Sequence, residues 1–334
     1  MSINIGINGF GRIGRTFLRA SRKYPEIKVV QINDPAPAAT LCHLLKYDSI
    51  HRKFPEEIVQ TEEGFIIGKD EIKFSHERQP SQIAWKNVDL VIESSGFFLD
   101  RNTVEGHFNS AIKKVLLSAP PKDKTIETIV YGVNEKQGNL NDKILSGASC
   151  TTHSAAPLIK ILDEHFGIES AFITTVHSFT GDQKLIDSPH KDLRRARSAP
   201  LSIIPTTTGA AKALGNIFPH LAENLGGGGI RVPVPDGSLT DITAFLKKEA
   251  SVEEINQLMQ HASTGAYKGI IAYTEEPLVS IDIIGRTESC VFDSDLTSVL
   301  GRMAKVVAWY DNETGYSNRL ADLVIYLKQN KYLD

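Results

Sequence analysis

The sequence predicts an α/β fold in two parts: a doubly wound parallel sheet, then an α+β domain with a mixed or antiparallel sheet. The length of 334 residues suits two domains, at roughly 100–200 residues per domain. Over roughly the first 150 residues, short apolar strand-like runs alternate with helix-like runs, which is typical of a parallel sheet with crossover helices. Beyond that point the strand-like runs become longer, which indicates a different kind of sheet.

The first half contains four buried strand-like runs and a helix between the first two. The strands are expected at residues 3–8, 27–33, 88–94 and 114–118, and the helix at 11–24. The last of these strands is closed by Pro120 and Pro121, which cannot continue a central strand. We expect these runs to form one parallel sheet in a domain spanning residues 1–149.

The second half combines strands with an irregular basic segment. Strands are expected at residues 170–177, 228–234, 240–247, 278–284 and 303–310, the basic loop at 178–204, and a glycine-rich hinge at 226–229. These belong to a second domain at residues 150–314. The helical run at 317–331 is expected to lie in a terminal segment, 315–334, that packs back on the first domain.

Composition excludes several classes of protein. The net charge is 37 − 40 = −3, which argues against nucleic acid or an anionic membrane as the main partner. No apolar run approaches the ~18 residues of a membrane span. Three scattered cysteines are too few for a disulfide framework or a zinc site, so we expect no metal and a reducing, cytoplasmic location.

A glycine pattern near the N-terminus predicts a dinucleotide site. Gly9, Gly11 and Gly14 form G-x-G-x-x-G between a strand and a helix, where a pyrophosphate can lie on the helix N-terminus. Asp34 follows the second strand, at the spacing expected of a carboxylate that binds the ribose 2′-hydroxyl. A 2′-phosphate would meet like charge there, so NAD is favoured over NADP. The alternative is a glycine-rich turn followed by an exposed acid.

Cys150 is the predicted nucleophile. It precedes the helix-like run at 155–166, and a thiol at a helix start meets unpaired N–H groups and the positive end of the helix dipole. Both are expected to favour the thiolate. His177, at the end of a predicted strand, is a candidate base. A hydrogen-bonded structural histidine suits that position too, since sequence alone does not show that the two side chains are adjacent.

Hydroxyl and guanidinium groups supply candidate phosphate ligands. Ser149, Thr151, Thr208 and Gly209 lie in hydroxyl-rich segments with free backbone donors, and Arg195 and Arg231 offer guanidinium groups. Ordinary capping and turn chemistry explains the hydroxyls equally well, and a short basic cluster is commonly a solvated surface.

Taken together, these segments resemble the phosphorylating, NAD-dependent glyceraldehyde-3-phosphate dehydrogenase family over essentially the whole chain. The resemblance rests on residues 8–15, 148–152, 175–177, 189–197, 208–213, 231–233 and 309–313. It implies an N-terminal Rossmann domain, a catalytic domain and a homotetramer in which residues 178–204 line a neighbouring subunit's cofactor site.

The resemblance also implies residue roles. Cys150 would attack glyceraldehyde 3-phosphate with His177 as base, and inorganic phosphate would cleave the thioester to give 1,3-bisphosphoglycerate. Thr180, Arg195 and Arg231 would form one anion site, and Ser149, Thr151, Thr208 and Gly209 the other. The cofactor-contacting set would be Gly9, Gly11, Arg12, Ile13, Gly14, Asp34, Arg78, Ser118 and Asn312.

Some positions depart from the family pattern. His153 stands where asparagine is usual, Ser154 where a second cysteine is common, and Ser188 weakens one marker of NAD selectivity. Two alternative functions remain: an erythrose-4-phosphate dehydrogenase, and a non-catalytic NAD- or RNA-binding homologue.

Overall fold

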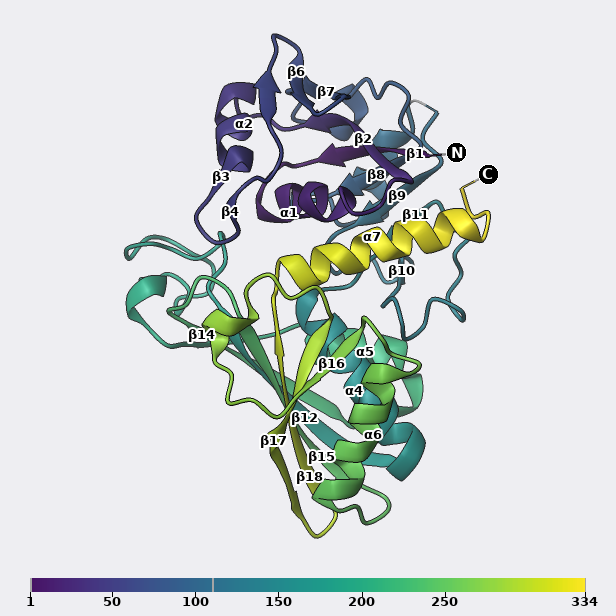
Figure 1. Ribbon diagram of the computed structural model, residues 1–334, viewed down its shortest axis with the longest axis vertical. Helices are drawn as coiled ribbons and strands as arrows, with labels where there is room; N and C mark the ends of the chain where they lie inside the picture. The colour runs from purple at the N-terminus through teal and green to yellow at the C-terminus, as the bar shows by residue number, and fades with distance from the viewer. Residues whose placement is uncertain (1, 110, 334) are drawn as a thin grey trace. The chain divides into compact units, whose positions relative to one another are not determined.

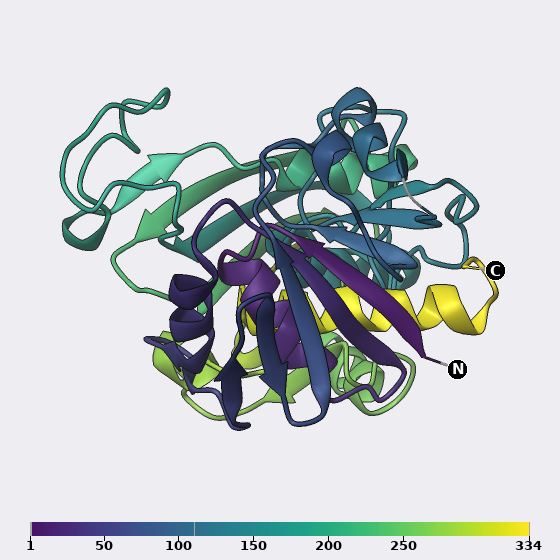
Figure 2. The same cartoon turned by 90° about the horizontal axis from the view of Figure 1, so that it is seen from above.

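The computed structural model describes residues 2–109 and 111–333, which divide into two compact units. Unit 1 comprises residues 1–148 together with the C-terminal residues 317–334, and unit 2 comprises residues 149–316. Figures 1 and 2 show the elements of each unit. Within the described residues, no helix is both long and apolar enough to cross a membrane.

Unit 1 is built on one nine-stranded sheet in the order β10-β11-β9-β8-β1-β2-β7-β6-β5. The strands are β1 (Ile3–Asn8), β2 (Ile27–Asn33), β5 (Ile58–Gln60), β6 (Gly64–Ile67), β7 (Asp70–Ser75), β8 (Leu90–Glu93), β9 (Lys114–Leu117), β10 (Glu127–Thr128) and β11 (Ile144–Ser146). All neighbouring pairs from β10 to β7 are parallel, and β5 and β6 add an antiparallel extension. The central strands β8 and β9 are buried along their whole length, as expected of a parallel sheet that is covered on both faces.

The helices of unit 1 are short. They are α1 (Arg12–Ser21), α2 (Ala38–Lys46), α3 (Arg101–Val104) and the 3₁₀ segments η1 (Pro80–Gln82) and η2 (Glu105–Asn109); β3 (Tyr47–Asp48) and β4 (Arg52–Lys53) form a small hairpin. The C-terminal helix α7 (Thr314–Gln329) packs on this unit: Ser317 bonds Thr16 at 2.8 Å, and Asp322 accepts from the Tyr24 hydroxyl at 2.6 Å.

Unit 2 is built on a mixed seven-stranded sheet in the order β13-β14-β12-β15-β18-β17-β16. The strands are β12 (Ile168–Ser178), β13 (Ile204–Thr206), β14 (Leu225–Val232), β15 (Ser238–Leu246), β16 (Ile271–Thr274), β17 (Cys290–Leu300) and β18 (Met303–Tyr310). The helices are α4 (Cys150–Phe166), α5 (Ala210–Ile217), α6 (Val252–Thr264) and the 3₁₀ segments η3 (Ala199–Leu201), η4 (Pro219–Leu221) and η5 (Ser280–Ile283). The predicted fold class, a doubly wound sheet followed by a mixed sheet, is therefore confirmed.

Two predicted elements of the second half are wrong. The glycine-rich hinge at 226–229 is part of β14, because the missing side chains let this strand lie close to its neighbours; a Cβ on Gly227 would come within 3.0 Å of the Ile173 carbonyl oxygen. The strand predicted at 278–284 is instead the 3₁₀ turn η5, in which the Asp282 carboxylate accepts the N–H of Val279 at 2.9 Å. The apolar residues of this turn produce a strand-like pattern in the sequence.

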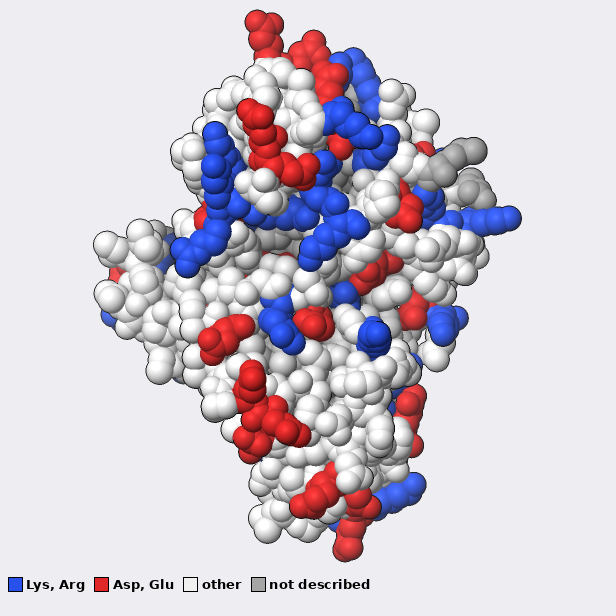
Figure 3. All heavy atoms as spheres, viewed as in Figure 1, with Lys and Arg blue, Asp and Glu red and all other residues white. Residues whose placement is uncertain are grey.

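The basic segment between β12 and β13 extends away from the sheet of unit 2 (Figure 2). It exposes large apolar side chains, namely Leu185, Ile186, Leu193, Leu201 and, just before β13, Ile203. Elsewhere the face in Figure 3 carries interspersed acidic and basic side chains, as expected for a net charge of −3.

Candidate active site

Cys150 opens helix α4 in a strained setting. Ala148, just before the helix, has φ +58°, which is costly for a residue with a Cβ and is often retained at functional sites. Ser149 is the N-cap: its hydroxyl accepts the backbone N–H of Thr152 at 3.2 Å and contacts the Thr152 hydroxyl at 2.7 Å. The helix begins five residues earlier than the apolar run suggested, and Cys150 occupies its first position.

His177 lies beside this cysteine. Its Nε2 is 3.5 Å from the Cys150 Sγ, and its Nδ1 is 2.7 Å from the carbonyl oxygen of Ser178. A proton on Nδ1 would donate to that carbonyl and leave the Nε2 lone pair facing the thiol. A hydrogen bond accepted by Nδ1 from the Arg231 guanidinium, 2.5 Å away, would instead place the proton of the neutral ring on Nε2. The structure thus brings together the two residues whose adjacency sequence could not show.

Arg231 holds the other side of the imidazole. It is paired with His177 in the parallel register of β12 and β14, and its Nη1 lies 2.5 Å from the His177 Nδ1 while donating to the Ser178 carbonyl at 3.0 Å. The guanidinium therefore touches the candidate base directly.

Burial and nearby charge determine the protonation states of His177 and Cys150. Burial and the positive charge of Arg231 lower the pKa of His177 to about 3, so the ring is neutral at physiological pH. Cys150 keeps some exposed surface, yet burial of its thiol raises the pKa of Cys150, although the Arg231 charge and the hydrogen bonds of Thr151 oppose the rise. The expectation that the helix start alone favours thiolate is therefore wrong, because desolvation outweighs it.

Tyr310 supports the pair from the core. Its hydroxyl bonds those of Thr151, at 2.9 Å, and Thr175, at 2.8 Å, and its ring meets the His177 ring edge-on with centroids 5.9 Å apart. Sequence reasoning gave Tyr310 and Thr175 no role. The available signal was the spacing of Thr175 and His177, which places both on one face of a strand.

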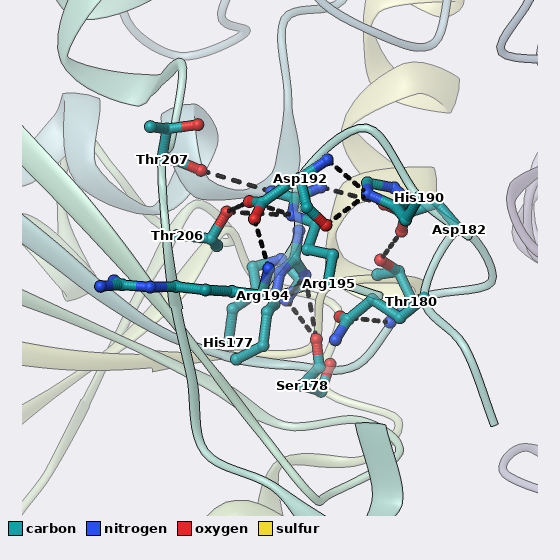
Figure 4. A network of polar contacts seen from close by, with 12 residues as sticks. His177, Ser178, Thr180, Asp182, His190, Asp192, Arg194, Arg195, Thr206 and Thr207 are labelled. Carbon is teal, nitrogen blue, oxygen red and sulfur yellow. Dashed lines mark hydrogen bonds and ion pairs between the residues drawn. The ribbon is translucent and has the colours of Figure 1, made fainter. Parts of the chain in front are cut away.

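Arg195 lies at the centre of the network in Figure 4. Its guanidinium pairs with Asp182 at 2.9 Å, donates to the Thr206 hydroxyl at 3.0 Å and reaches the Thr207 carbonyl at 3.3 Å. The Thr180 hydroxyl bonds the same Asp182 carboxylate. Two members of the predicted anion set, Thr180 and Arg195, thus meet through an acid that an incoming phosphate would have to displace.

The second predicted anion set lies at two helix starts in unit 2. The Ser149 hydroxyl caps α4 and the Thr151 hydroxyl bonds Tyr310, so both are engaged within the protein. Thr208 accepts the N–H of Ala210 at 3.2 Å, and Gly209 begins α5 without a side-chain cap. Because the hydroxyls are already engaged, these residues can bind an anion mainly through their backbone N–H groups.

The two unusual neighbours of Cys150 face the protein interior. The buried His153 ring packs edge-on against Tyr316, with centroids 5.7 Å apart. Ser154 is fully buried and its hydroxyl accepts from Thr240 at 2.9 Å.

The predicted dinucleotide turn lies at the carboxyl end of β1 in unit 1. Gly9 has φ +87°, and a Cβ there would lie 2.5 Å from the backbone of Ser95. A Cβ on Gly14 would lie 2.3 Å from the Gly9 carbonyl oxygen, whereas Gly11 faces open space at the start of α1. A bare turn leading into a helix N-terminus suits a pyrophosphate, so these residues fit the predicted cofactor.

Other predicted cofactor residues lie at the same sheet edge. Asp34 follows β2; its carboxylate accepts the N–H of Phe10 at 2.8 Å and of Ala36 at 2.9 Å, so it also supports the turn. Ser118 follows β9 and donates its N–H to the Glu93 carbonyl at 2.9 Å.

Arg12, Ile13 and Arg78 complete the set in unit 1. Arg12 opens α1 and pairs with the buried Asp48 at 2.6 Å, a partner that sequence reasoning missed; Ile13 follows it in the helix, and Arg78 is exposed in the loop after β7. In unit 2, the Asn312 side-chain oxygen accepts from the hydroxyls of Ser178 and Ser238, both at 2.7 Å, which fixes the orientation of its amide group.

A doubly wound sheet with this glycine turn, and a mixed-sheet domain in which Cys150 lies beside a buried His177, define a nicotinamide-dependent dehydrogenase. Comparison with known proteins identifies the family. Residues 3–101 match the model for "Glyceraldehyde 3-phosphate dehydrogenase, NAD binding domain", and residues 149–312 match the C-terminal domain of the same family. The chain belongs to the glyceraldehyde-3-phosphate dehydrogenase family.

Full-length relatives support the same conclusion. The chain is similar to glyceraldehyde-3-phosphate dehydrogenases from Thermotoga maritima (53% identity over 95% of this chain and 97% of the relative) and Geobacillus stearothermophilus (50% over 98% of both). It is 48% identical to the one from Priestia megaterium, again over 98% of both chains. The predictions of an NAD-dependent dehydrogenase and of NAD as cofactor are therefore confirmed.

Proposed function

We propose that this protein oxidises D-glyceraldehyde 3-phosphate with NAD and inorganic phosphate to 1,3-bisphosphoglycerate and NADH, as a glycolytic or gluconeogenic enzyme. The observation that carries the proposal is the Cys150 Sγ at 3.5 Å from the His177 Nε2, in a chain of this family. NAD supplies the hydride acceptor.

The proposed chemistry uses the Cys150–His177 pair twice. The thiol proton passes to the His177 Nε2 as Sγ adds to the aldehyde carbon, and it returns to the substrate oxygen to give a hemithioacetal. As the hydride leaves that carbon, His177 takes the hydroxyl proton and a thioester remains. A phosphate oxygen then attacks the thioester carbon, the C–S bond breaks, and the departing thiolate recovers a proton from the imidazolium.

Two phosphate groups must be held during this cycle, one on the substrate and one as the second nucleophile. We assign Thr180, Arg195 and Arg231 to one anion site and Ser149, Thr151, Thr208 and Gly209 to the other. The guanidinium of Arg195, which donates to the Thr206 hydroxyl and to the Asp182 carboxylate, supports the first assignment. The helix starts of α4 and α5 support the second.

We also propose a cytoplasmic homotetramer. The exposed apolar side chains of the 178–204 segment support an assembly that covers them, since contiguous exposed apolar surface commonly marks an interface. Three cysteines without a disulfide agree with a reducing compartment.

A coupled set of assays tests the proposed reaction. NADH should form from glyceraldehyde 3-phosphate only when phosphate or arsenate is present, and more efficiently than from erythrose 4-phosphate. Cys150→Ser should lower kcat by about 10³-fold or more, because a hydroxyl is a far weaker nucleophile than a thiol. Cys42→Ser, which changes a buried cysteine of α2, is the matched control and should retain activity. Phosphate-independent release of the free acid, or turnover in the Cys150 variant near that of the control, would refute the proposal.

A further inference from the structure

A network of hydrogen bonds between buried polar side chains in unit 1 extends to the glycine turn. Glu93, the last residue of β8, and His107 of η2 both have fully buried side chains, and the His107 Nε2 lies 3.0 Å from the Glu93 Oε2. The indole N–H of Trp85 meets the other ring nitrogen, Nδ1, at 3.1 Å. The function described above uses none of these three residues.

Trp85 determines the protonation state of His107. An indole N–H can only donate, so the His107 Nδ1 must accept. The proton of the neutral ring then lies on Nε2, which donates to the Glu93 carboxylate. The contact between His107 and Glu93 is therefore a directed hydrogen bond in which the imidazole Nε2 donates to the carboxylate.

Glu93 gathers further donors from both loops at this sheet edge. Its Oε2 accepts from the Asn8 side-chain amide at 2.5 Å, and its Oε1 accepts from the Ser95 N–H at 2.8 Å and the Ser95 hydroxyl at 2.5 Å. A buried carboxylate without a cation requires several donors, and here they come from the ends of two adjacent strands, β1 and β8, where Asn8 and Glu93 are register partners.

The loops that Glu93 joins are those that shape the glycine turn. Asn8 directly precedes Gly9, and Ser95 is the residue whose backbone a Cβ on Gly9 would strike at 2.5 Å. The Ser94 hydroxyl adds a bond to the Gly9 carbonyl oxygen at 2.7 Å. Any shift of the Ser95 loop would therefore change the space available beside Gly9.

We propose that His107 is a positioning residue for NAD binding: with Trp85 behind it, it orients the Glu93 carboxylate, which locks the Asn8 and Ser95 loops into the shape that accepts the pyrophosphate. This inference rests on the proposal that the Gly9–Gly14 turn holds the dinucleotide. It assigns a cofactor-binding role to residues that need not touch the cofactor.

Calorimetric NAD titration of full-length protein tests the role. His107→Phe should raise the Kd and the KM for NAD about tenfold, the equivalent of one strong hydrogen bond, with kcat at saturating NAD little changed. His107→Gln, whose amide can still donate to Glu93, should restore most of the affinity. This difference between KM and kcat, with rescue by the amide, is not expected of a residue that merely stabilises the fold.

A matched control separates positioning from general loosening. Lys114, also buried in this unit, donates to the carbonyl oxygens of Leu140 and Asp142 away from the glycine turn, so Lys114→Met should lower the melting temperature without changing the Kd for NAD. Equal losses of NAD affinity in the Lys114 and His107→Phe variants, or wild-type affinity in folded His107→Phe, would overturn the inference.

A second variant covers the case in which His107→Phe does not fold. Trp85→Phe keeps an aromatic ring but removes the donor to His107, and it should weaken NAD binding by a smaller factor than His107→Phe is expected to; unchanged affinity would count against the role. Gly14→Val tests the underlying site instead: if that variant binds NAD like the wild type, the proposed dinucleotide turn is wrong, whatever His107 does.

Discussion

The charge of Arg231 makes the protonation of His177 depend on what binds nearby. Burial and the guanidinium, which lies 2.5 Å from the imidazole, lower the pKa of His177 to about 3. A phosphate dianion bound beside Arg231 would offset that charge, so we expect substrate binding to raise the pKa of His177 and prepare it to accept a proton. Binding and activation of the base would then be one event.

The low pKa of His177 also makes a prediction about stability. An unfolded histidine has a pKa near ~6.5, so below that pH the unfolded chain binds a proton that the folded chain does not, and stability falls as pH falls from there toward about 3. His177→Gln lacks this group and should lose less thermal stability between pH 7 and pH 5 than the wild type does.

The melting temperature of both proteins is measured at pH 7 and at pH 5. The change in the wild type is then compared with the change in His177→Gln, so that the contributions of other titrating groups cancel. His220→Gln is the control, because this more exposed histidine pairs with Asp163 at 2.7 Å and lies apart from Arg231 and Cys150 in the sequence and in its contacts. An equal loss of stability in wild type and His177→Gln would show that the His177 ring is not held neutral.

Among the elements, β14 shows how a strand can be made from glycines. Four consecutive glycines, residues 226–229, pair in parallel with β12, and this register carries Arg231 to its place opposite His177. At Gly226 and Gly227, neighbouring atoms occupy the space that a side chain would need. The position of the guanidinium is thus coupled to how closely β14 approaches β12 and α5.

This packing predicts different tolerances at adjacent glycines. A side chain at Gly227 would meet the Ile173 carbonyl at 3.0 Å and the Ala211 Cβ at 3.1 Å, whereas at Gly228 the nearest atom is 3.9 Å away on Phe172. Gly227→Val should therefore destabilise the protein by ~1–3 kcal/mol through overpacking. Gly228→Val is the matched control and should cost little. Denaturant unfolding measures the free energy of unfolding of both variants. Equal losses of stability in the two would contradict this prediction.

At the scale of the whole molecule, the folding of a single chain does not explain why segment 178–204 exposes large apolar side chains. Its apolar side chains are strongly exposed, with Leu201 at 83% and Ile203 at 69%. A folded monomer gains nothing from exposing them, and the proposed tetramer would bury them. The same segment carries Thr180 and Arg195 of the proposed anion site, so the proposed assembly and substrate binding share one loop.

Charged residues in this loop should therefore impair assembly. Leu201→Glu with Ile203→Glu is expected to convert the proposed tetramer to smaller species, because a carboxylate buried at an apolar interface loses its hydration without gaining a partner. Light scattering after size-exclusion chromatography measures the mass. Val59→Glu, at an exposed apolar position of unit 1, is the control and should leave the tetramer intact; an unchanged mass in the double variant would contradict the role of the loop.

The sequence by itself determined the fold class, the family and the cofactor. Local patterns can be recognised in a sequence without knowledge of the fold. They include the strand and helix periods, the glycine spacing ahead of Asp34, and Cys150 at a helix start. Tertiary structure alone decided what those groups do to one another. It placed the Arg231 charge on His177, made desolvation outweigh the helix start at Cys150, turned a supposed glycine hinge into a strand, and joined His107 to the turn at Gly9 through Glu93. Each of these depends on burial and on contacts between residues distant in sequence, which no local pattern contains.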